Sequence, residues 1–190
     1  PQAAQQQAPQ QQQQLLLLQQ QQQQMLQQQH VLITREYQTM HTTFGMWRER
    51  VPNPWEDIMI WNDLFCWRQF VLKEVNQILA SLPLVVPSFQ QQQSVQAQQQ
   101  QSTQQQQQIY QQTQQQLQQL QLLGTRESVW HTVTLASVYR TQGVPESCLH
   151  TLQKVYQAKT IDVAEAHRKL REQIKSELAC GNARQAYEVA

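Results

Sequence analysis

Two glutamine tracts limit what this chain can fold into more than any other feature of the sequence. They run from Pro1 to Gln29 and from Gln90 to Gln121, consist mostly of glutamine, and contain no charged residue. Such tracts bury too little apolar surface to offset the entropy of ordering the chain. About 120 of the 190 residues therefore remain to build a core. We expect the second tract to be a solvent-exposed insertion that has little to pack against.

A tryptophan-rich stretch organises the remaining residues. Asn53 can cap a helix, Pro54 suits the first helical position, and Glu56 completes a capping box. From there a broad apolar run predicts one helix over residues 54–80, covered on two or more sides. Four of the five tryptophans fall in or just before it, and we expect them to pack in the core: Trp47, Trp55, Trp61 and Trp67.

Helical periodicity continues on both sides of this stretch. Residues 30–46 have apolar residues three to four apart, which weakly predicts a helix, and the prolines at 83 and 87 predict an extended exit. Beyond Gly124, helices are predicted to begin near residues 126, 145, 163 and 183. A helix pair that recurs about every 35 residues is close to the tetratricopeptide period of about 34.

The side chains support this repeat in part. The first copy places large and small residues at the expected positions: Leu135, Ala136, Tyr139, Cys148, Leu152 and Val155. A shift of about 35 gives the second copy, in which only Arg171 stands where a small residue is wanted, and the register could be one residue off: Leu170, Arg171, Ile174, Ala183, Tyr187 and Ala190. The inward face of the helix near 163 is predicted as Val163, Ala166, Leu170, Ile174 and Leu178.

The predicted fold is all-α, a tetratricopeptide-like helical-repeat solenoid with glutamine-rich insertions that are disordered or transiently helical. We divide it into a glutamine-rich segment (1–29), a helical segment with the tryptophan-rich buried helix (30–89), a glutamine-rich insertion (90–121) and helix pairs (122–190). The chain lacks an initiator Met and ends inside a predicted helix, so we expect it to be an excerpt of a longer protein.

Composition argues against several functions. The formal net charge is +1, and the charged residues are interspersed rather than gathered into the basic stripe that nucleic-acid binding needs. No stretch is long and apolar enough for a membrane span or a signal peptide. Three well-separated cysteines predict reduced thiols in a cytosolic or nuclear protein rather than a disulfide framework.

No residue pattern predicts catalysis or cofactor binding. The tryptophans could form a stacking platform, but their helical spacing favours core packing. Glu56 and Asp57 could be acid–base catalysts, but at a helix N-terminus they more simply complement the helix dipole. The five histidines have no partners at metal-ligand spacing, and the basic residues of 167–171 suit a solvated helix face. We therefore predict no catalytic, cofactor-binding or metal-binding residues, and partner-binding residues remain unknown.

Two blocks nevertheless resemble a known family. They are similar to the FAT region of the transformation/transcription domain-associated proteins, which are giant pseudokinases of the phosphatidylinositol-3-kinase-related family. The first block carries the resemblance through Trp47, Arg50, Pro52, Trp55, Asp57, Trp61, Asn62, Asp63, Leu64, Trp67, Arg68 and Gln69. The second carries it through Pro145, Glu146, Cys148, Leu152, Tyr156, Ile161, Glu165, Ala166, Lys169, Leu170, Arg171, Glu172 and Gln173.

This resemblance implies a fragment of a FAT solenoid in a non-catalytic nuclear scaffold. Such a scaffold would bridge DNA-bound transcription activators and histone acetyltransferase complexes, with protein partners and no cofactor. Two alternatives stay open: the FAT region of a catalytically active family kinase, and an unrelated glutamine-rich tetratricopeptide transcription factor. The glutamine tracts interrupt the family pattern.

Overall fold

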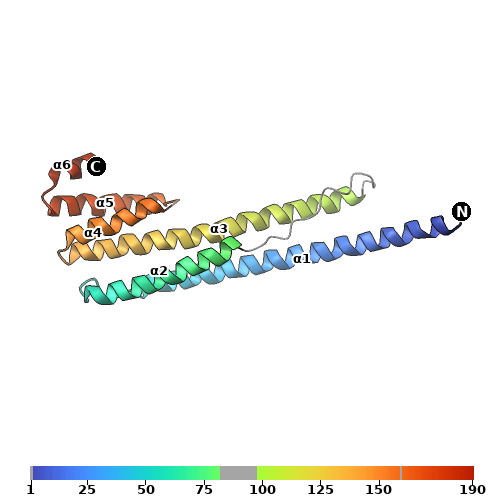
Figure 1. The fold of residues 1–190 in the computed structure, drawn as a ribbon, viewed down its shortest axis with the longest axis horizontal. Coiled ribbons are helices and arrows are strands. Elements are labelled where there is room, and N and C mark those ends of the chain that lie inside the picture. The colour runs from blue at the N-terminus through green and yellow to red at the C-terminus, as the bar shows by residue number, and fades with distance from the viewer. Residues whose placement is uncertain (1, 82–97, 159) are drawn as a thin grey trace. The chain divides into compact units, whose positions relative to one another are not determined.

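Every regular secondary-structure element in the described part of the chain is a helix. A computed structural model describes residues 2–81, 98–158 and 160–190. The helices are α1 (Gln2–Glu49), α2 (Ile58–Ser81), α3 (Gln98–Thr141), α4 (Pro145–Gln153), the 3₁₀-helix η2 (Lys154–Gln157), α5 (Val163–Ala179) and α6 (Ala183–Val189) (Figure 1). The all-α prediction is confirmed. The exit predicted at 82–87 lies outside the described residues.

The chain forms two compact units. One comprises residues 1–40 and 82–119, and the other comprises residues 41–81 and 120–190. The helices α1 and α3 each contribute to both units, whereas α2 and α4 to α6 belong to the second unit alone.

In the first unit, α1 and α3 run parallel to each other. The hydroxyl of Thr34 donates to Gln116 Oε1 at 2.7 Å, and Thr113 Oγ1 lies 3.3 Å from His30 Nδ1. Thr113, which lies within the second glutamine tract, is buried, and so are three apolar side chains of this unit: Leu26, Ile33 and Leu117. The expectation that a helix in the tract would have little to pack against is therefore wrong for its C-terminal part.

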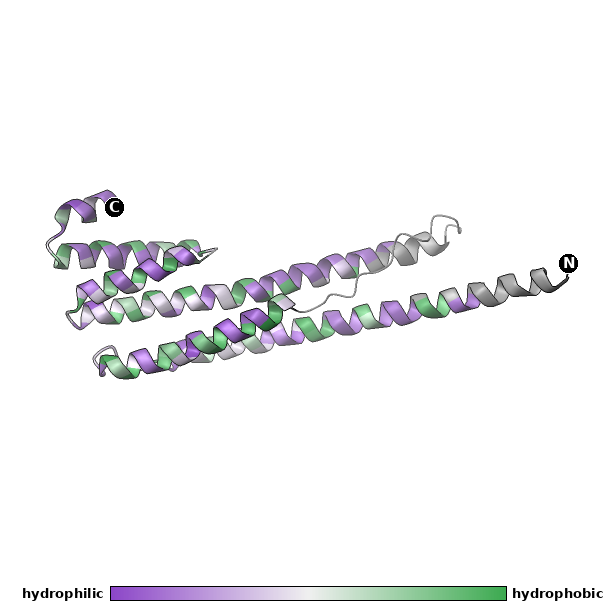
Figure 2. Ribbon diagram, viewed as in Figure 1, coloured by the Kyte–Doolittle hydropathy of each residue, from purple (hydrophilic) through white to green (hydrophobic). Residues whose placement is uncertain are grey.

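In the second unit, α2 contributes one narrow buried seam. Its buried residues are Trp61, Phe65, Arg68, Leu72 and Leu79, spaced mostly four and three apart as in a coiled coil. Figure 2 shows hydrophobic residues at many points along α2. Several large apolar side chains of this helix lie outside the seam and are exposed: Met59, Ile60, Trp67, Phe70 and Ile78. The prediction of a broadly buried tryptophan helix is wrong, because a heptad seam buries only about two residues in seven.

The start of α2 lies four residues later than predicted. Asn53 caps a local turn instead, since its side-chain oxygen accepts from the backbone N–H of Trp55 at 3.0 Å. Asp57 then caps the helix, accepting from the backbone N–H of Met59 at 2.8 Å. Because Trp55 belongs to the turn rather than the helix, its side chain is 75% exposed, contrary to the predicted core position.

The helix start predicted after Gly124 is also wrong, since α3 continues through this glycine. Here α2 approaches α3 so closely that a Cβ on Gly124 would lie 2.2 Å from Asn76 Oδ1. The glycine therefore permits a helix contact rather than marking a helix end.

The C-terminal helices pack against one another in chain order, α4 on α5 and α5 on α6. A core cluster joins the end of α3 to α4 and η2 and consists of Val129, Val133, Ala136, Cys148, Leu152 and Val155. At α5 the predicted register fails by one residue: Arg171 points outward and Glu172 is buried, where it accepts a hydrogen bond from Arg140 Nε at 2.5 Å. Other polar residues of α5 are buried with it, and the residues predicted to point inward are exposed at Val163, Leu170 and Leu178.

Candidate functional site

The centre of the second unit is a polar and aromatic cluster built on the heptad seam. Arg68 of α2 is only 4% exposed, although it is charged. Its guanidinium donates to the backbone oxygens of Trp47 at 2.8 Å and Arg50 at 2.9 Å, and so satisfies carbonyls at the C-terminal end of α1. A cation in this position also complements the helix dipole. The guanidinium carbon of Arg68 lies 5.3 Å from the ring centroid of Trp47, which adds a cation–π contact.

Glu127 of α3 is the buried anion of this cluster. Arg48 of α1 donates to its carboxylate through Nε at 3.0 Å and Nη2 at 2.8 Å. Burial raises the pKa of Glu127, and the hydrogen bonds and charge of Arg48 oppose that rise. The pair thus holds the end of α1 to α3.

His131 lies one turn further along α3 and is fully buried. Its Nδ1 lies 2.7 Å from the backbone oxygen of Glu127, so Nδ1 carries the proton and donates it to that carbonyl. Burial lowers the pKa of His131 to about 4. The imidazole is therefore neutral near pH 7, and rings of three residues surround it at centroid distances of 4.9 to 6.0 Å: Trp47, Phe65 and Trp130.

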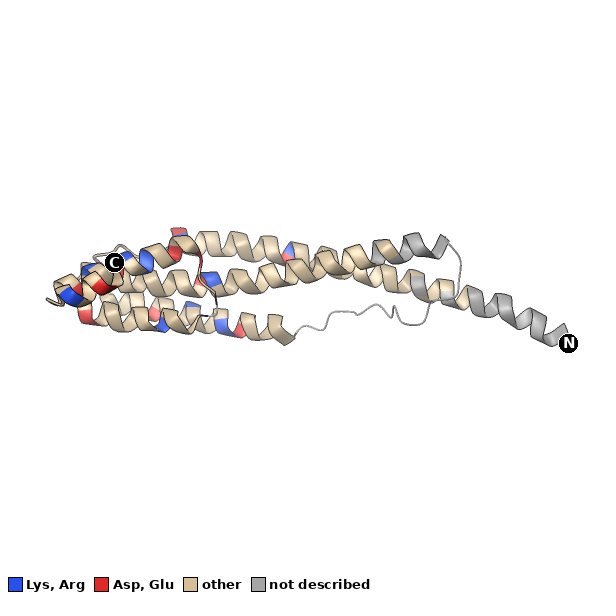
Figure 3. Ribbon diagram, turned by 90° about the horizontal axis from the view of Figure 1, so that it is seen from above, with Lys and Arg blue, Asp and Glu red and all other residues tan. Residues whose placement is uncertain are grey.

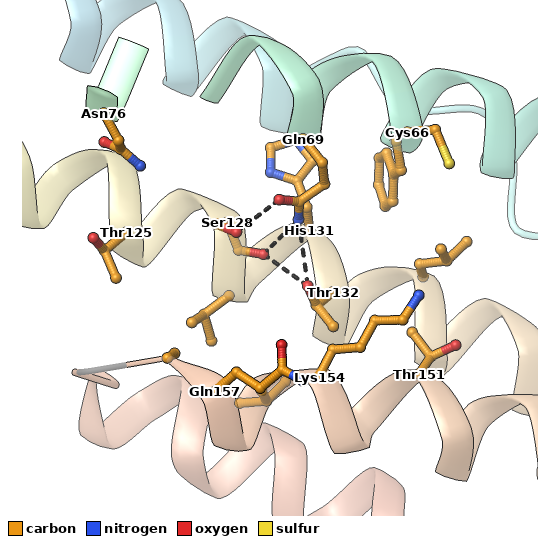
Figure 4. A pocket seen from close by; sticks show the side chains of 15 residues that line it. Cys66, Gln69, Asn76, Thr125, Ser128, His131, Thr132, Thr151, Lys154 and Gln157 are labelled. Carbon is orange, nitrogen blue, oxygen red and sulfur yellow. Dashed lines mark hydrogen bonds between the residues drawn. The ribbon is translucent and has the colours of Figure 1, made fainter. Parts of the chain in front are cut away.

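A pocket of about 520 Å³ opens beside this cluster, between α2, α3 and the α4–η2 segment (Figure 4). Its apolar wall includes Phe65, Val129, Leu135, Val155 and Ala158. A second hollow of about 380 Å³ shares three of its lining residues, Gln69, Asn76 and Ser128, and extends along α2 past Lys73 to Ala80. Together the two hollows form one groove, which we call the α2–α3 groove.

One wall of the groove is fixed by a side-chain amide. Gln69 Nε2 donates to the backbone oxygen of Ser128 at 2.8 Å, and Ser128 Oγ donates back to Gln69 Oε1 at 2.7 Å. Thr132 Oγ1 lies 3.3 Å from the same Nε2 (Figure 4). These bonds hold the wall in one geometry before any ligand arrives.

The tryptophans and basic residues considered as candidate sites in the sequence lie in different parts of the structure. Of the clustered tryptophans, Trp61 is buried and donates its indole N–H to the backbone oxygen of Asn53 at 3.0 Å, which is a core role. Trp67 is 59% exposed but packs beside Trp47, with centroids 6.0 Å apart. The basic cluster includes a buried member, Lys169, which hydrogen-bonds Tyr156.

The buried positions of the three ionisable residues in this cluster, Arg68, Glu127 and His131, were not predicted from the sequence. Their position in the heptad pattern is the signal that indicates them. The spacing 61, 65, 68, 72 in α2 and 120, 127, 131 in α3 is four and three, or a multiple, so a search at that period would have placed them on the seam.

The ionisable side chains of this cluster form their hydrogen bonds inside the fold. Arg68 and His131 bond backbone carbonyl oxygens, and Glu127 accepts from Arg48 of α1. Within the described ranges, no group of three His, Cys, Asp or Glu side chains could hold a metal ion. None of the described helices has a stretch apolar and long enough to span a membrane.

The chain matches a known protein family. The FAT domain family matches residues 8–189. The chain is also similar to the SAGA complex/NuA4 acetyltransferase complex subunit TRA1 of Saccharomyces cerevisiae, 30% identical over 157 residues. The subunit of the same description, Tra1, from Schizosaccharomyces pombe is 33% identical over 137 residues.

These similarities cover much of this chain and little of the relatives. The aligned residues are 75% of this chain against 4% of the Saccharomyces protein, and 72% against 3% of the Schizosaccharomyces protein. The family match spans nearly the whole sequence, agrees with the all-helical fold, and includes both blocks on which the sequence resemblance rests. The chain belongs to the FAT domain family.

Proposed function

We propose that this chain is a non-catalytic scaffold segment of a transcription coactivator subunit that bridges DNA-bound activators and histone acetyltransferase complexes. The observation that carries the proposal is its similarity to two subunits of SAGA and NuA4 acetyltransferase complexes. The partners are proteins, the location is the nucleus, and the parent protein is a pseudokinase of the phosphatidylinositol-3-kinase-related family.

The cluster at Arg68 and Glu127 supports a structural role. Both charged groups are buried, and their hydrogen bonds join three helices instead of facing a substrate site. Buried, fully bonded charges of this kind specify one helix arrangement, and removing one partner is destabilising. A scaffold needs such a rigid arrangement, because it must hold its partners at fixed distances.

As part of this proposal, the chain divides into segments 1–29, 30–89, 90–121 and 122–190. The helix pairs of residues 122–190 form the repeat unit. The glutamine-rich part of α3 carries no charged residue before Arg126 (Figure 3). This part of α3 therefore carries uncharged amide groups rather than a charged surface.

The test is to purify the full-length protein from nuclei under an epitope tag and to identify the copurifying proteins by mass spectrometry. We expect acetyltransferase subunits and their assembly partners. A preparation without acetyltransferase subunits, but with general transcription factors, would favour the unrelated glutamine-rich factor.

A second measurement separates the scaffold from an active family kinase. The purified full-length protein is incubated with labelled ATP and a mixed protein substrate, with a variant lacking the kinase-like region as the control. We expect equal incorporation in both samples. Phosphoryl transfer that depends on that region would overturn the non-catalytic proposal.

A further inference from the structure

The α2–α3 groove has a distinctive charge pattern. Among its described lining residues the only charged side chains are Lys73 and Lys154, and neither makes an ion pair with another described residue. The lining includes no aspartate or glutamate. A groove lined by one sign of charge attracts ligands of the opposite sign.

The floor of the groove is apolar and rigid. Val129 and Val155 line it and also belong to the buried core cluster of α3, α4 and η2. Phe65 lines it from α2 and is itself 2% exposed. Because these side chains are fixed by core packing, the floor is formed before binding, as ligand sites usually are.

The length of the groove favours a peptide over a small molecule. Its α2 wall runs from Phe65 to Ala80, which at the helical rise is about 22 Å. A volume of about 520 Å³ at one end can accept apolar side chains, whereas the extension past Lys73 has a smaller volume of about 380 Å³. Thr125 and Thr132 line the larger end, and their hydroxyls donate to backbone oxygens of α3. Each hydroxyl oxygen can still accept a hydrogen bond from a peptide N–H.

We propose that the α2–α3 groove binds an acidic peptide segment of a partner protein. An apolar side chain of the peptide enters the pocket above Val129 and Val155, and its carboxylates lie at Lys154 and Lys73. The groove proposal rests on the proposed function in one respect, because both take the partners of the chain to be proteins.

Cys66 provides a native reporter for this site. It is exposed and lines the groove, whereas Cys180 at the end of α5 does not line it. The experiment treats the full-length protein with iodoacetamide and follows alkylation of each cysteine by mass spectrometry. The probe is a short synthetic peptide of aspartate and glutamate around one phenylalanine and one leucine.

We expect the peptide to slow alkylation of Cys66 roughly tenfold at ten times its dissociation constant, and to leave the rate at Cys180 unchanged. A peptide with lysine in place of each acidic residue should not protect Cys66. Protection by the basic peptide, protection by a single-stranded oligonucleotide, or no protection by the acidic peptide would each overturn the proposal.

Charge reversal supplies the matched test. Lys154→Glu should weaken the acidic peptide roughly five- to tenfold and allow the basic peptide to protect Cys66. Lys175→Glu is the control, because Lys175 is an exposed lysine of α5 outside the groove. An equal loss in both variants would mean that general charge, not this groove, attracts the peptide.

The two proposals fail in different ways. If the groove proposal is wrong, Lys154→Glu leaves peptide binding unchanged while acetyltransferase subunits still copurify with the protein. If the scaffold proposal is wrong, those subunits are absent from the wild-type preparation, whatever the peptide does.

Discussion

The carboxylate of Glu127 lies 2.8 Å from Arg48 Nη2, yet the two side chains differ greatly in exposure, at 1% and 44%. The buried member depends on the partly solvated one for its hydrogen bonds. Since a buried carboxylate without donors is strongly disfavoured, the exposed arginine controls whether this part of the seam is stable.

Arg48→Ala should therefore destabilise the protein by about 2–4 kcal/mol, somewhat below the value for breaking a fully buried pair. Adding Glu127→Gln to that variant should restore part of the loss, because a neutral amide is cheaper to bury than an unpaired carboxylate. Urea unfolding of the wild type and both variants at pH 7 measures this. A double variant no more stable than Arg48→Ala would show that Glu127 is not the reason for the loss.

The pH dependence of the Arg48→Ala variant follows from the same residue. Burial raises the pKa of Glu127 above its ordinary value, so the folded protein binds this proton more tightly than the unfolded chain does. Stability from this group is present at low pH and is lost as pH rises through the folded pKa. Without Arg48 the pKa of Glu127 rises further, and we expect the urea midpoint of Arg48→Ala to fall more steeply with rising pH than that of wild type.

The lowered pKa of His131 predicts that stability changes with pH in the opposite direction. Its folded pKa of about 4 lies below its ordinary value of 6.5, so the unfolded state binds the proton first as pH falls. Stability from this group is present above 6.5 and is lost as pH falls towards 4, by roughly 3 kcal/mol in total. His131→Phe keeps a ring among Trp47, Phe65 and Trp130, and should flatten this loss.

Urea midpoints of wild type and His131→Phe at pH 5, 6 and 7 provide the measurement. His167→Phe is the matched control, since that histidine is exposed on α5. If His131→Phe loses as much stability as wild type between pH 7 and pH 5, another group carries the effect.

The sequence predicts the helices better than the contacts between them. The start of α4 at Pro145 and the cap of α5 at Asp162 follow from local signals, and the structure has both. The local signals at Gly124 and Asn53 predict a helix boundary and a helix cap that the structure does not have. Tertiary packing decides there, because the glycine serves a close helix approach and the asparagine caps a turn.

The tryptophans show why side-chain burial was harder to predict. Hydrophobicity alone places Trp55, Trp61 and Trp67 together, but the start of α2 and the heptad position separate them. Trp61 falls on the seam, whereas Trp67 falls beside it and Trp55 lies before the helix. The groove could not be predicted at all, since it depends on how α2 and η2 meet α3.

Substitution of the tryptophans should reproduce this order. Trp61→Ala should cost about 3–5 kcal/mol, because the buried ring and its hydrogen bond to Asn53 are both lost. Trp67→Ala should cost about 1 kcal/mol from its contact with Trp47. Trp55→Ala should change stability by less than about 0.5 kcal/mol. Equal losses of stability in Trp55→Ala and Trp61→Ala, measured by urea unfolding, would contradict the prediction that Trp61 packs in the heptad seam and Trp55 does not.

The contact at Gly124 makes a coupled prediction. Gly124→Ala would bring a Cβ to 2.2 Å from Asn76 Oδ1, so the amide must move, and the usual gain of alanine in a helix is offset. In an Asn76→Ala background the obstacle is gone, and Gly124→Ala should stabilise by about 1 kcal/mol. A double-mutant cycle by thermal unfolding measures the coupling. Additive effects of the two substitutions would mean that α2 and α3 do not meet here.

The end of the second glutamine tract should behave as part of the core. Leu120 is 1% exposed, and the side chain of Gln121 donates to the backbone oxygen of Leu79 at 3.2 Å. Replacing residues 90–121 with a Gly/Ser linker therefore removes contacts of α2, and the unchanged protection that the sequence predicts for α2 is no longer expected.

A smaller change tests this more sharply by hydrogen exchange. Leu120→Ala should cost about 2–5 kcal/mol and speed amide exchange in α2 and in α3 near residue 120. Gln118→Ala and Gln119→Ala are the matched controls, because both side chains are exposed on the same turn and alanine favours the helix. If Leu120→Ala exchanges as slowly as these controls, the tract makes no stabilising contact and its helix stands apart from the core.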